Sequence, residues 1–307
     1  MALNSSGPIS LAGTTTGVSI EIENGGNGTT TISLNDTAVR TLAGVTTPGS
    51  TIIMPTNFYG KSNAFTFTIT SNQSNANLRS LAVTAGWNQS SALQATINST
   101  IVCSASSTGN YGLTINGSFP GGVTLTNNGY ILGMGGSGGW GGSPQYGYCP
   151  KTQGSSGGTG LLISSAVTIN NASGVIGGGG GGAGGGSIGQ FNCNCPINVG
   201  GGGGGGGRTG STNSSGGPVG PYGAMGSGGN AGTQSSGGGG GAGKYCGPAH
   251  GGGGGTGGTW GASGGCGGAG YPNAPEWLGG GGGGGNATSG ASNVTWTNVG
   301  TRYGTVG

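Results

Sequence analysis

Charged side chains are scarce in this sequence. Only 4% of the 307 residues are Asp, Glu, Lys or Arg, whereas a typical soluble protein has about 25%. The net charge is only +3, which provides no surface for a polyanion, so nucleic acid is not an expected partner. The same shortage excludes disorder driven by high charge.

The shortage of acids also argues against catalysis. A glycosidase needs two carboxylates flanking one bond, and Glu276 is the only acid after Asp36. A Ser-His-Asp arrangement would need His250 with Glu276, but no Gly-x-Ser-x-Gly context is present. Residues 238–244 match most of a phosphate-binding loop, but Tyr245 stands where Ser or Thr is required. We therefore expect no enzyme and no cofactor.

Long apolar runs are absent as well. None approaches the roughly 18 residues that predict a membrane-spanning helix. Proline is too rare, at 12 residues, and the glycines are too irregular for collagen. The first residues lack a basic stretch followed by an apolar one, so no secretory signal is expected.

Glycine is the abundant residue, with 87 positions, and its distribution divides the chain. Only 16 glycines lie in residues 1–132, and 71 lie in residues 133–307. The first 60 residues also differ in character from those that follow. We expect three regions: a small module at 1–60, a β-rich neck at 61–132 and a glycine-rich tip at 133–307.

The first 132 residues predict a mainly β fold with little α-helix. Alternating or apolar runs predict strands at 18–23, 29–34, 51–54, 64–70, 93–97 and 101–103. One short helix is expected over 37–42, with Asn35 or Asp36 as its cap. Leu78, Leu81, Val83 and Trp87 predict a further buried element.

A repeat crosses the boundary between neck and tip. Residues 123–139 and 167–185 each consist of a strand, an Asn-containing turn, a second short strand and a glycine tract. Residues 113–116 and 161–163 precede the two copies in matching positions. Such self-similarity is typical of stacked supersecondary units. We expect the two copies to pair their strands and to start two parallel glycine tracts.

The glycine tracts lie at 177–186, 200–207, 237–243, 251–258 and 279–285, with a looser one at 133–142. A flexible linker is one interpretation, because glycine is costly to order. Polyglycine can also form a left-handed threefold helix with a rise of about 3.1 Å, whose N–H and C=O groups all point outwards. The similar tract lengths favour this alternative. We predict a polyglycine II helix bundle, a sandwich with long apical loops.

The segments between the tracts, 143–160, 187–199, 208–236, 244–250 and 259–278, carry most aromatic and sulfur residues of this half. Loops on a stiff scaffold are the usual place for binding residues, and Tyr and Trp are the usual anchors. The aromatic and basic residues predicted to bind a receptor are Tyr146, Tyr148, Lys151, Phe191, Arg208, Tyr222, Lys244, Tyr245, His250, Trp260, Tyr271 and Trp277.

The six cysteines leave several arrangements open. Disulfides between loops are open to Cys149, Cys193, Cys195, Cys246 and Cys266, and Cys103 is expected to be a buried free thiol. A zinc site from Cys193, Cys195, Cys246 and His250 would lack the usual C-x₂-C spacing, so no metal is predicted.

Residues 134–307 resemble the glycine-rich host-recognition tip of phage long tail fibres, the adhesin of T-even-type phages. The resemblance rests on the alternation of glycine tracts with aromatic-rich segments. It implies a sandwich of polyglycine helices whose loops bind a host receptor, either an outer-membrane protein or a surface glycan. It also implies a location in the virion, at the tail fibre or tail tip.

The N-terminal region carries a second resemblance. Residues 33–44 (SLNDTAVRTLAG) and 52–61 (IIMPTNFYGK) are similar to a module of other phage tail proteins, and 77–87 (NLRSLAVTAGW) is similar to a segment of such proteins. The front half departs from the T-even adhesin. The resemblance of residues 33–61 to tail modules implies that residues 1–60 attach the chain to other tail or fibre proteins. A monomer and a homotrimer are both open.

The expected function is therefore host-cell recognition and adsorption through the loops. A structural glycine-rich virion or filament protein is the alternative, and alanine substitution of the loop aromatics would leave adsorption unchanged in that case. An antifreeze-like bundle ranks last, because its regular Gly-X-X repeat is missing. The sequence does not identify the host, the receptor or the docking partner.

Overall fold

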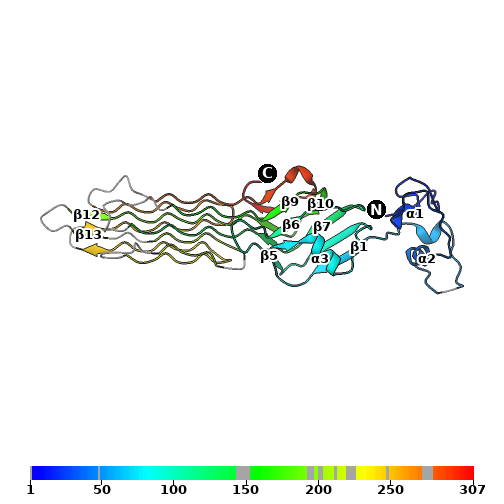
Figure 1. Cartoon of the computed structure of the whole chain (residues 1–307), viewed down its shortest axis with the longest axis horizontal. Coiled ribbons are helices and arrows are strands. Elements are labelled where there is room, and N and C mark those ends of the chain that lie inside the picture. The colour runs from blue at the N-terminus through cyan, green and yellow to red at the C-terminus, as the bar shows by residue number, and fades with distance from the viewer. Residues whose placement is uncertain are drawn as a thin grey trace.

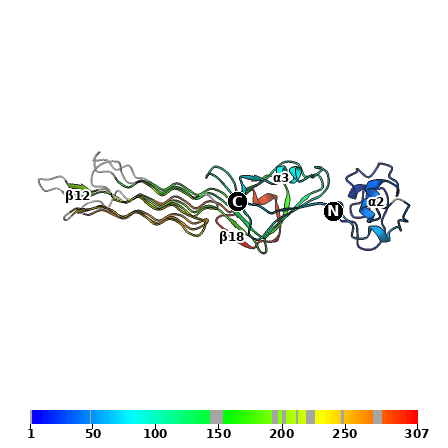
Figure 2. The same ribbon diagram turned by 90° about the horizontal axis from the view of Figure 1, so that it is seen from below.

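The computed structural model describes residues 2–47, 49–142, 153–191, 197–199, 203–210, 213–218, 226–246, 249–271 and 279–307. The molecule is elongated (Figures 1 and 2). The short helices of the N-terminal region lie at one end, the main β region lies in the middle, and long glycine-rich runs extend to the other end. The C-terminus lies in the β region rather than at the far end of the runs. Across the described residues, no helix combines the length and apolar character needed to cross a bilayer.

Three parallel sheets form the β region. The first contains, in order, β1 (Phe65–Ile69), β4 (Leu93–Ile97), β7 (Val123–Asn127), β10 (Val167–Asn170) and β17 (Val294–Asn298). The second contains β18 (Thr301–Tyr303), β11 (Val175–Gly177), β8 (Tyr130–Leu132), β5 (Val102–Ser104) and β2 (Gln73–Ser74). The third contains β16 (Thr288–Ser289), β9 (Leu161–Ile163), β6 (Leu113–Ile115) and β3 (Ala76–Asn77).

The chain visits the three sheets in turn, so the β region is a parallel β-helix. Its second coil is β4, β5 and β6, and its third is β7, β8 and β9. Registers place like residues above one another, as in the ladder Phe67, Ala95, Leu125, Ile169 and Trp296. The inward residues of these ladders form one buried core. The predicted repeat is confirmed, because its two copies are successive coils of this helix.

The asparagines of the repeat occupy the turn between the first two sheets. The Asn127 Nδ2 donates to the Asn171 Oδ1 at 2.7 Å, and both residues are buried. The Asn171 Nδ2 donates in turn to the carbonyls of Val299 and Thr301, at 3.0 and 3.2 Å. The two buried asparagines therefore join the last three coils through side-chain hydrogen bonds.

Substitution Asn171→Ala is expected to destabilise the β-helix by about 1–3 kcal/mol, because it leaves buried polar groups unpaired. The exposed Asn298, in the neighbouring strand, provides the control Asn298→Ala, which should change stability by less than about 0.5 kcal/mol. Thermal unfolding of the two variants tests this. Equal losses would mean that the ladder contributes nothing specific.

The N-terminal region corrects three strand predictions. Residues 18–23 contain the helix α1 (Ile20–Glu23), because the Ser19 hydroxyl caps it by accepting from the Ile22 N–H. Residues 29–34 and 51–54 form no strand; a 3₁₀ turn, η1 (Thr56–Phe58), follows the latter. These segments instead pack their apolar residues around Phe58 in a separate core.

The other predicted elements of residues 1–132 are confirmed. Helix α2 (Thr37–Ala43) begins after Asp36 and ends at Gly44, which has a left-handed φ of 71°. The strands at 64–70, 93–97 and 101–103 correspond to β1, β4 and β5. Helix α3 (Leu78–Thr84) buries Leu78, whereas Val83 is exposed. A short 3₁₀ helix, η3 (Ala291–Asn293), precedes β17.

The glycine-rich runs exchange backbone hydrogen bonds at intervals of three residues. The N–H groups of Gly133, Gly136, Gly139 and Gly142 donate to the carbonyls of Gly177, Gly180, Ala183 and Gly186, at 2.7–2.9 Å. The two glycine tracts of the repeat therefore run parallel and side by side, as predicted. The same three-residue interval joins residues 252–261 to 178–187 in the antiparallel sense.

The hydrogen bonds arrange ten runs in three layers, which we call the glycine bundle. The first outer layer contains the runs 153–160, 133–142 and 213–218. The middle layer contains 279–285, 178–187, 203–210 and 226–233. The second outer layer contains 262–270, 251–258 and 237–243. The runs 178–187 and 203–210 each bond to six neighbours, and 178–187 is buried along its whole length.

Close approach explains why these positions are glycine. A Cβ at Gly181 would overlap the carbonyl oxygen of Gly282, and one at Gly182 would overlap that of Ser137. Such overlaps recur at most glycines of the bundle, and the overlapping atoms are backbone atoms that cannot rotate away. Most side chains therefore appear where a run faces outwards, as at Ser137 and Thr256, although small ones such as Ala183 and Ser214 are buried.

Candidate functional site

The far end of the glycine bundle carries a cluster of three rings, Tyr245, His250 and Tyr271, which we call the tip triad. Strands β14 (Tyr245–Cys246) and β15 (Ala249–His250) form an antiparallel pair in which Tyr245 lies opposite His250. Tyr271 lies on the other side of His250, and the two residues exchange backbone hydrogen bonds of 3.0 and 2.8 Å. Ring centroids are 5.2 Å apart for Tyr245 and His250, and 5.6 Å for His250 and Tyr271.

Each triad residue is the last of a series of positions spaced three residues apart along one run of the second outer layer. The three series are 239, 242 and 245; 256, 253 and 250; and 265, 268 and 271. The earlier positions hold only small residues: Gly239, Ala242, Gly253, Thr256, Gly265 and Gly268. Tyr245 and Tyr271 are 73% and 60% exposed. The backbone therefore holds a row of rings at the end of a face whose other positions carry only glycine, alanine and threonine.

A second hairpin lies beside the triad. Strands β12 (Gly189–Phe191) and β13 (Ile197–Val199) pair antiparallel and contact β15. Figure 1 shows β12 and β13 at the far end of the bundle. The backbone of Phe191 thus lies at the tip, as predicted, while its side chain lies outside the described part. Lys244, next to Tyr245, is exposed.

Trp140 is a tip residue that the sequence analysis missed. It is 53% exposed and belongs to the series Met134, Ser137, Trp140 on the first outer layer, near the far end of the bundle. It therefore lies on the outer layer opposite the tip triad. Its position inside a glycine tract concealed it, because the sequence prediction assigned binding residues only to the segments between the tracts.

Arg208 and Trp260 were predicted to lie in tip loops, but they lie at the base of the bundle. The run 203–210 returns from the tip, so Arg208 lies at the base of the bundle, beside the β-helix. Trp260 lies in the turn between 251–258 and 262–270, is 8% exposed, and packs with Val102 and Leu132. The Arg208 guanidinium carbon stands 3.6 Å from the centre of the Trp260 ring.

The loops are shorter than the predicted segments 143–160, 208–236 and 259–278, because parts of these segments belong to the glycine bundle. Residues 153–160, 213–218, 226–233 and 262–270 are runs of the bundle, although they contain fewer glycines. Most of their polar side chains lie in outward positions of the threefold interval, whereas the buried Ser214 hydroxyl donates to the Gly207 carbonyl. The predicted binding residues Tyr146, Tyr148, Lys151, Tyr222 and Trp277 lie outside the described residues.

The cysteines that can be placed are both free thiols. Cys103 is buried in the β-helix, as predicted, and burial raises the pKa of its thiol to about 12. Cys266 is exposed and unpaired, which corrects its proposed place in a disulfide; it lies on the outer edge of the run 262–270 rather than in a tip loop. Cys149, Cys193, Cys195 and the side chain of Cys246 lie outside the described part.

Thiol alkylation should distinguish these two cysteines. At pH 8 we expect iodoacetamide to modify Cys266 in the folded chain and to modify Cys103 only after unfolding, because the thiolate is the nucleophile. Mass spectrometry of the two peptides measures the labelling. Equal labelling of both cysteines in the folded chain would contradict the burial of Cys103.

The raised pKa of Cys103 also predicts that stability falls above about pH 9, where the unfolded thiol ionises and the folded one does not.

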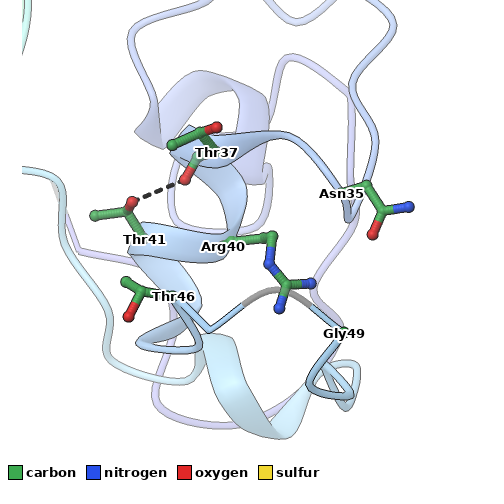
Figure 3. Close-up of a pocket in the computed structure, with 6 residues that line it drawn as sticks. All are labelled: Asn35, Thr37, Arg40, Thr41, Thr46 and Gly49. Carbon is green, nitrogen blue, oxygen red and sulfur yellow. Dashed lines mark hydrogen bonds between the residues drawn. The ribbon is translucent and has the colours of Figure 1, made fainter.

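A hollow of about 330 Å³ in the N-terminal region is lined by Asn35, Thr37, Arg40, Thr41, Thr46 and Gly49 (Figure 3). An Arg40 Nη2 donates to the carbonyls of Thr47 and Ser50, at 2.7 and 3.1 Å. This arginine therefore closes the loop after α2. Within the described ranges, His, Cys, Asp and Glu side chains form no group of three that suits a metal ion.

A long scaffold of bonded runs that exposes aromatic rings at its far end defines a class of protein, the fibrous binding proteins. The family model for the phage tail fibre adhesin Gp38 matches residues 64–307, and the chain belongs to this family. The protein is thus a receptor-binding adhesin of a phage tail fibre, located in the virion. The family is one of adhesins rather than of enzymes.

The match also corrects the expected extent of the resemblance. It begins at residue 64 rather than 134, so the β-helix belongs to the adhesin family, and residues 1–63 lie outside the match. The fold is similar to that in the crystal structure of the gp37–gp38 adhesin tip complex of the bacteriophage S16 long tail fibre. The TM-score is 0.52 and the identity 24%, over 87% of this chain and 90% of that one. No curated protein matches.

Proposed function

We propose that the glycine bundle consists of polyglycine II helices that hold the receptor-binding residues at the tip. The three-residue hydrogen-bond interval supports this, since a polyglycine II helix has three residues per turn. The six-neighbour bonding of 178–187 supports it as well, because eight of its ten residues are glycine and lack the Cβ that would keep neighbouring runs apart. The bundle resists bending, so binding does not first have to order the tip.

The single observation that carries the receptor site is the exposure of the tip triad on this stiff support. Tyrosine anchors are enriched among the residues that dominate binding energy. The site contains Tyr245, His250 and Tyr271 with Lys244 beside them, and Trp140 adds a contact on the opposite outer layer. The host receptor is an outer-membrane protein or a surface glycan. The other residues predicted to bind it are Tyr146, Tyr148, Lys151, Phe191, Tyr222 and Trp277, and we propose that they belong to the same receptor site.

We further propose that residues 1–60 dock the adhesin to another tail protein, with 61–132 as the neck and 133–307 as the tip. The separate apolar core around Phe58 supports an independent role for the first region. The structural neighbour is a complex of two tail fibre proteins, which supports a tail protein as the partner. Binding alone, without catalysis, serves adsorption.

Exchange of the tip segments between two related phages tests the function. Residues 143–152, 188–202, 219–225, 244–250 and 271–278 would be replaced by those of a phage with another host, leaving the bundle runs intact. The expected result is a change of host range that follows the segments. Unchanged host range would favour a purely structural glycine-rich protein.

A further inference from the structure

The base of the glycine bundle holds an open hollow of about 440 Å³, away from the tip. Its lining residues are Tyr130, Arg208, Thr233, Gln234, Ser235 and Trp260. They come from β8, from the end of one run and from two turns, so the folded junction of bundle and β-helix builds the hollow. A volume of this size suits a small ligand.

Arg208 gives the hollow a cation. Its Nε donates to the Gln234 carbonyl at 2.8 Å, and its guanidinium stacks on Trp260. In the part of the chain that the structure describes, no carboxylate forms an ion pair with it. Burial lowers the pKa of Arg208, although the nearby Tyr303 and Tyr130 act in the opposite direction. Among the described residues, no other acceptor is bonded to its remaining N–H donors, which can donate to an anion from outside.

Arg208 differs in this respect from Arg40. The Arg40 guanidinium donates to two backbone carbonyls and so has a structural role. Arg208 is held in place by one carbonyl and one aromatic ring, which orient its planar fork. Such a fork matches a carboxylate in bidentate fashion.

The other groups around Arg208 suit a polyhydroxylated ring. The turn that contains Thr233 and Ser235 is ordered by hydrogen bonds, and their hydroxyls lie 2.9 Å apart. The Gln234 side chain adds an amide that can donate and accept. The ring of Tyr130 lines the hollow beside Trp260, with the two ring centroids 6.3 Å apart, and provides apolar surface.

We infer that this hollow is a binding site for a carboxylate-bearing sugar. The carboxylate accepts hydrogen bonds from Arg208, the sugar hydroxyls bond to Gln234 and Ser235, and a C–H face of the ring packs on Tyr130. An acidic side chain of a partner protein would use the arginine but would leave the hydroxyl and amide groups unused. The adhesin therefore has a glycan contact on its flank as well as a receptor contact at its tip.

Titration of the full chain with glucuronate, galacturonate and N-acetylneuraminate tests the site, with tryptophan fluorescence and saturation-transfer NMR as readouts. We expect at least one of these acids to bind, and glucose, galactose and acetate each to bind at least about tenfold more weakly. Acetate as strong as the acidic sugars would reduce the hollow to a general anion site and overturn the inference. Equal binding of neutral sugars, or no binding of any acid, would overturn it too.

Variants identify the residues. Arg208→Gln should lower the affinity at least about tenfold, whereas Arg302→Gln, an arginine stacked on Trp296 at 5.0 Å, should leave it unchanged. Gln234→Ala keeps the backbone carbonyl that holds Arg208 and should weaken sugar binding without affecting the fold. Unchanged binding in both Arg208→Gln and Gln234→Ala would contradict the site. The result is independent of tip-mediated adsorption, because none of these residues lies at the tip.

Discussion

Substitution Gly282→Ala is expected to lower the free energy of unfolding of the glycine bundle by about 3 kcal/mol. The new Cβ would overlap the carbonyl oxygen of Ser155. Gly282 also bonds on both sides, donating to Gly182 and accepting from Gly264. Relief of the overlap must therefore displace a run that is already fixed by its neighbours, and hydrogen bonds are lost with it.

The adjacent glycine supplies the matched control. At Gly283 the nearest atom to an added Cβ is the Ser156 Oγ at 3.7 Å, an ordinary contact. Gly283→Ala should be neutral or stabilise by about 0.5 kcal/mol, because alanine has less conformational freedom in the unfolded chain. Calorimetric unfolding of both variants measures the difference.

A second pair repeats the comparison in an outer run. A Cβ at Gly240 would overlap the carbonyl of Gly254, whereas at Gly239 the nearest atom is the Asn230 Nδ2 at 3.5 Å. Gly240→Ala should destabilise and Gly239→Ala should not. If both members of each pair behaved alike, close packing of the runs would not account for the stability of the bundle.

The β-helix could be predicted in part because its signal is local. Alternating apolar residues marked β1 and β4, and the Asn-containing repeat marked the coils that contain β7 and β10. Their stacking into three sheets could not be read, because the glycine runs separate β8 from β9 and β11 from β16 along the chain. The inserted runs return to the same edge, and only the folded structure shows this.

The direction of the runs was the main gap in the prediction of the site. Glycine density marked the buried runs but not outward-facing ones such as 213–218 and 226–233, in which side chains are tolerated. Arg208 and Trp260 were consequently assigned to the tip although they lie at the base. The three-residue interval was the missed signal, since it would have placed Trp140 in an outward position.

The N-terminal region shows a different limit. Residues 18–23 alternate apolar and polar side chains, which is typical of a strand, yet a capped helical turn forms there. Four residues are too few for periodicity to distinguish the two structures. The capping hydroxyl of Ser19 and the contacts of Ile20 with the core around Phe58 decide the outcome.

Replacement of both Tyr245 and Tyr271 by alanine is expected to reduce adsorption about 10- to 100-fold. Both rings are exposed, so their removal leaves no cavity inside the bundle, and the backbone hydrogen bonds between His250 and Tyr271 do not depend on the side chain. The loss should therefore appear in binding rather than in thermal unfolding. Adsorption rates of virions that carry the variant, together with binding of the purified chain to host cells, measure it.

Tyr111→Ala, in the neck between β5 and β6, is the control for loss of a tyrosine away from the tip and should adsorb normally. Trp140→Ala separates the two outer layers. A smaller loss for Trp140→Ala alone, which adds to that of the double variant, is expected because the two contacts lie on opposite faces and distant sites act independently. Normal adsorption by the Tyr245 and Tyr271 double variant would remove the tip triad from the receptor site. It would leave recognition to the segments between the bundle runs.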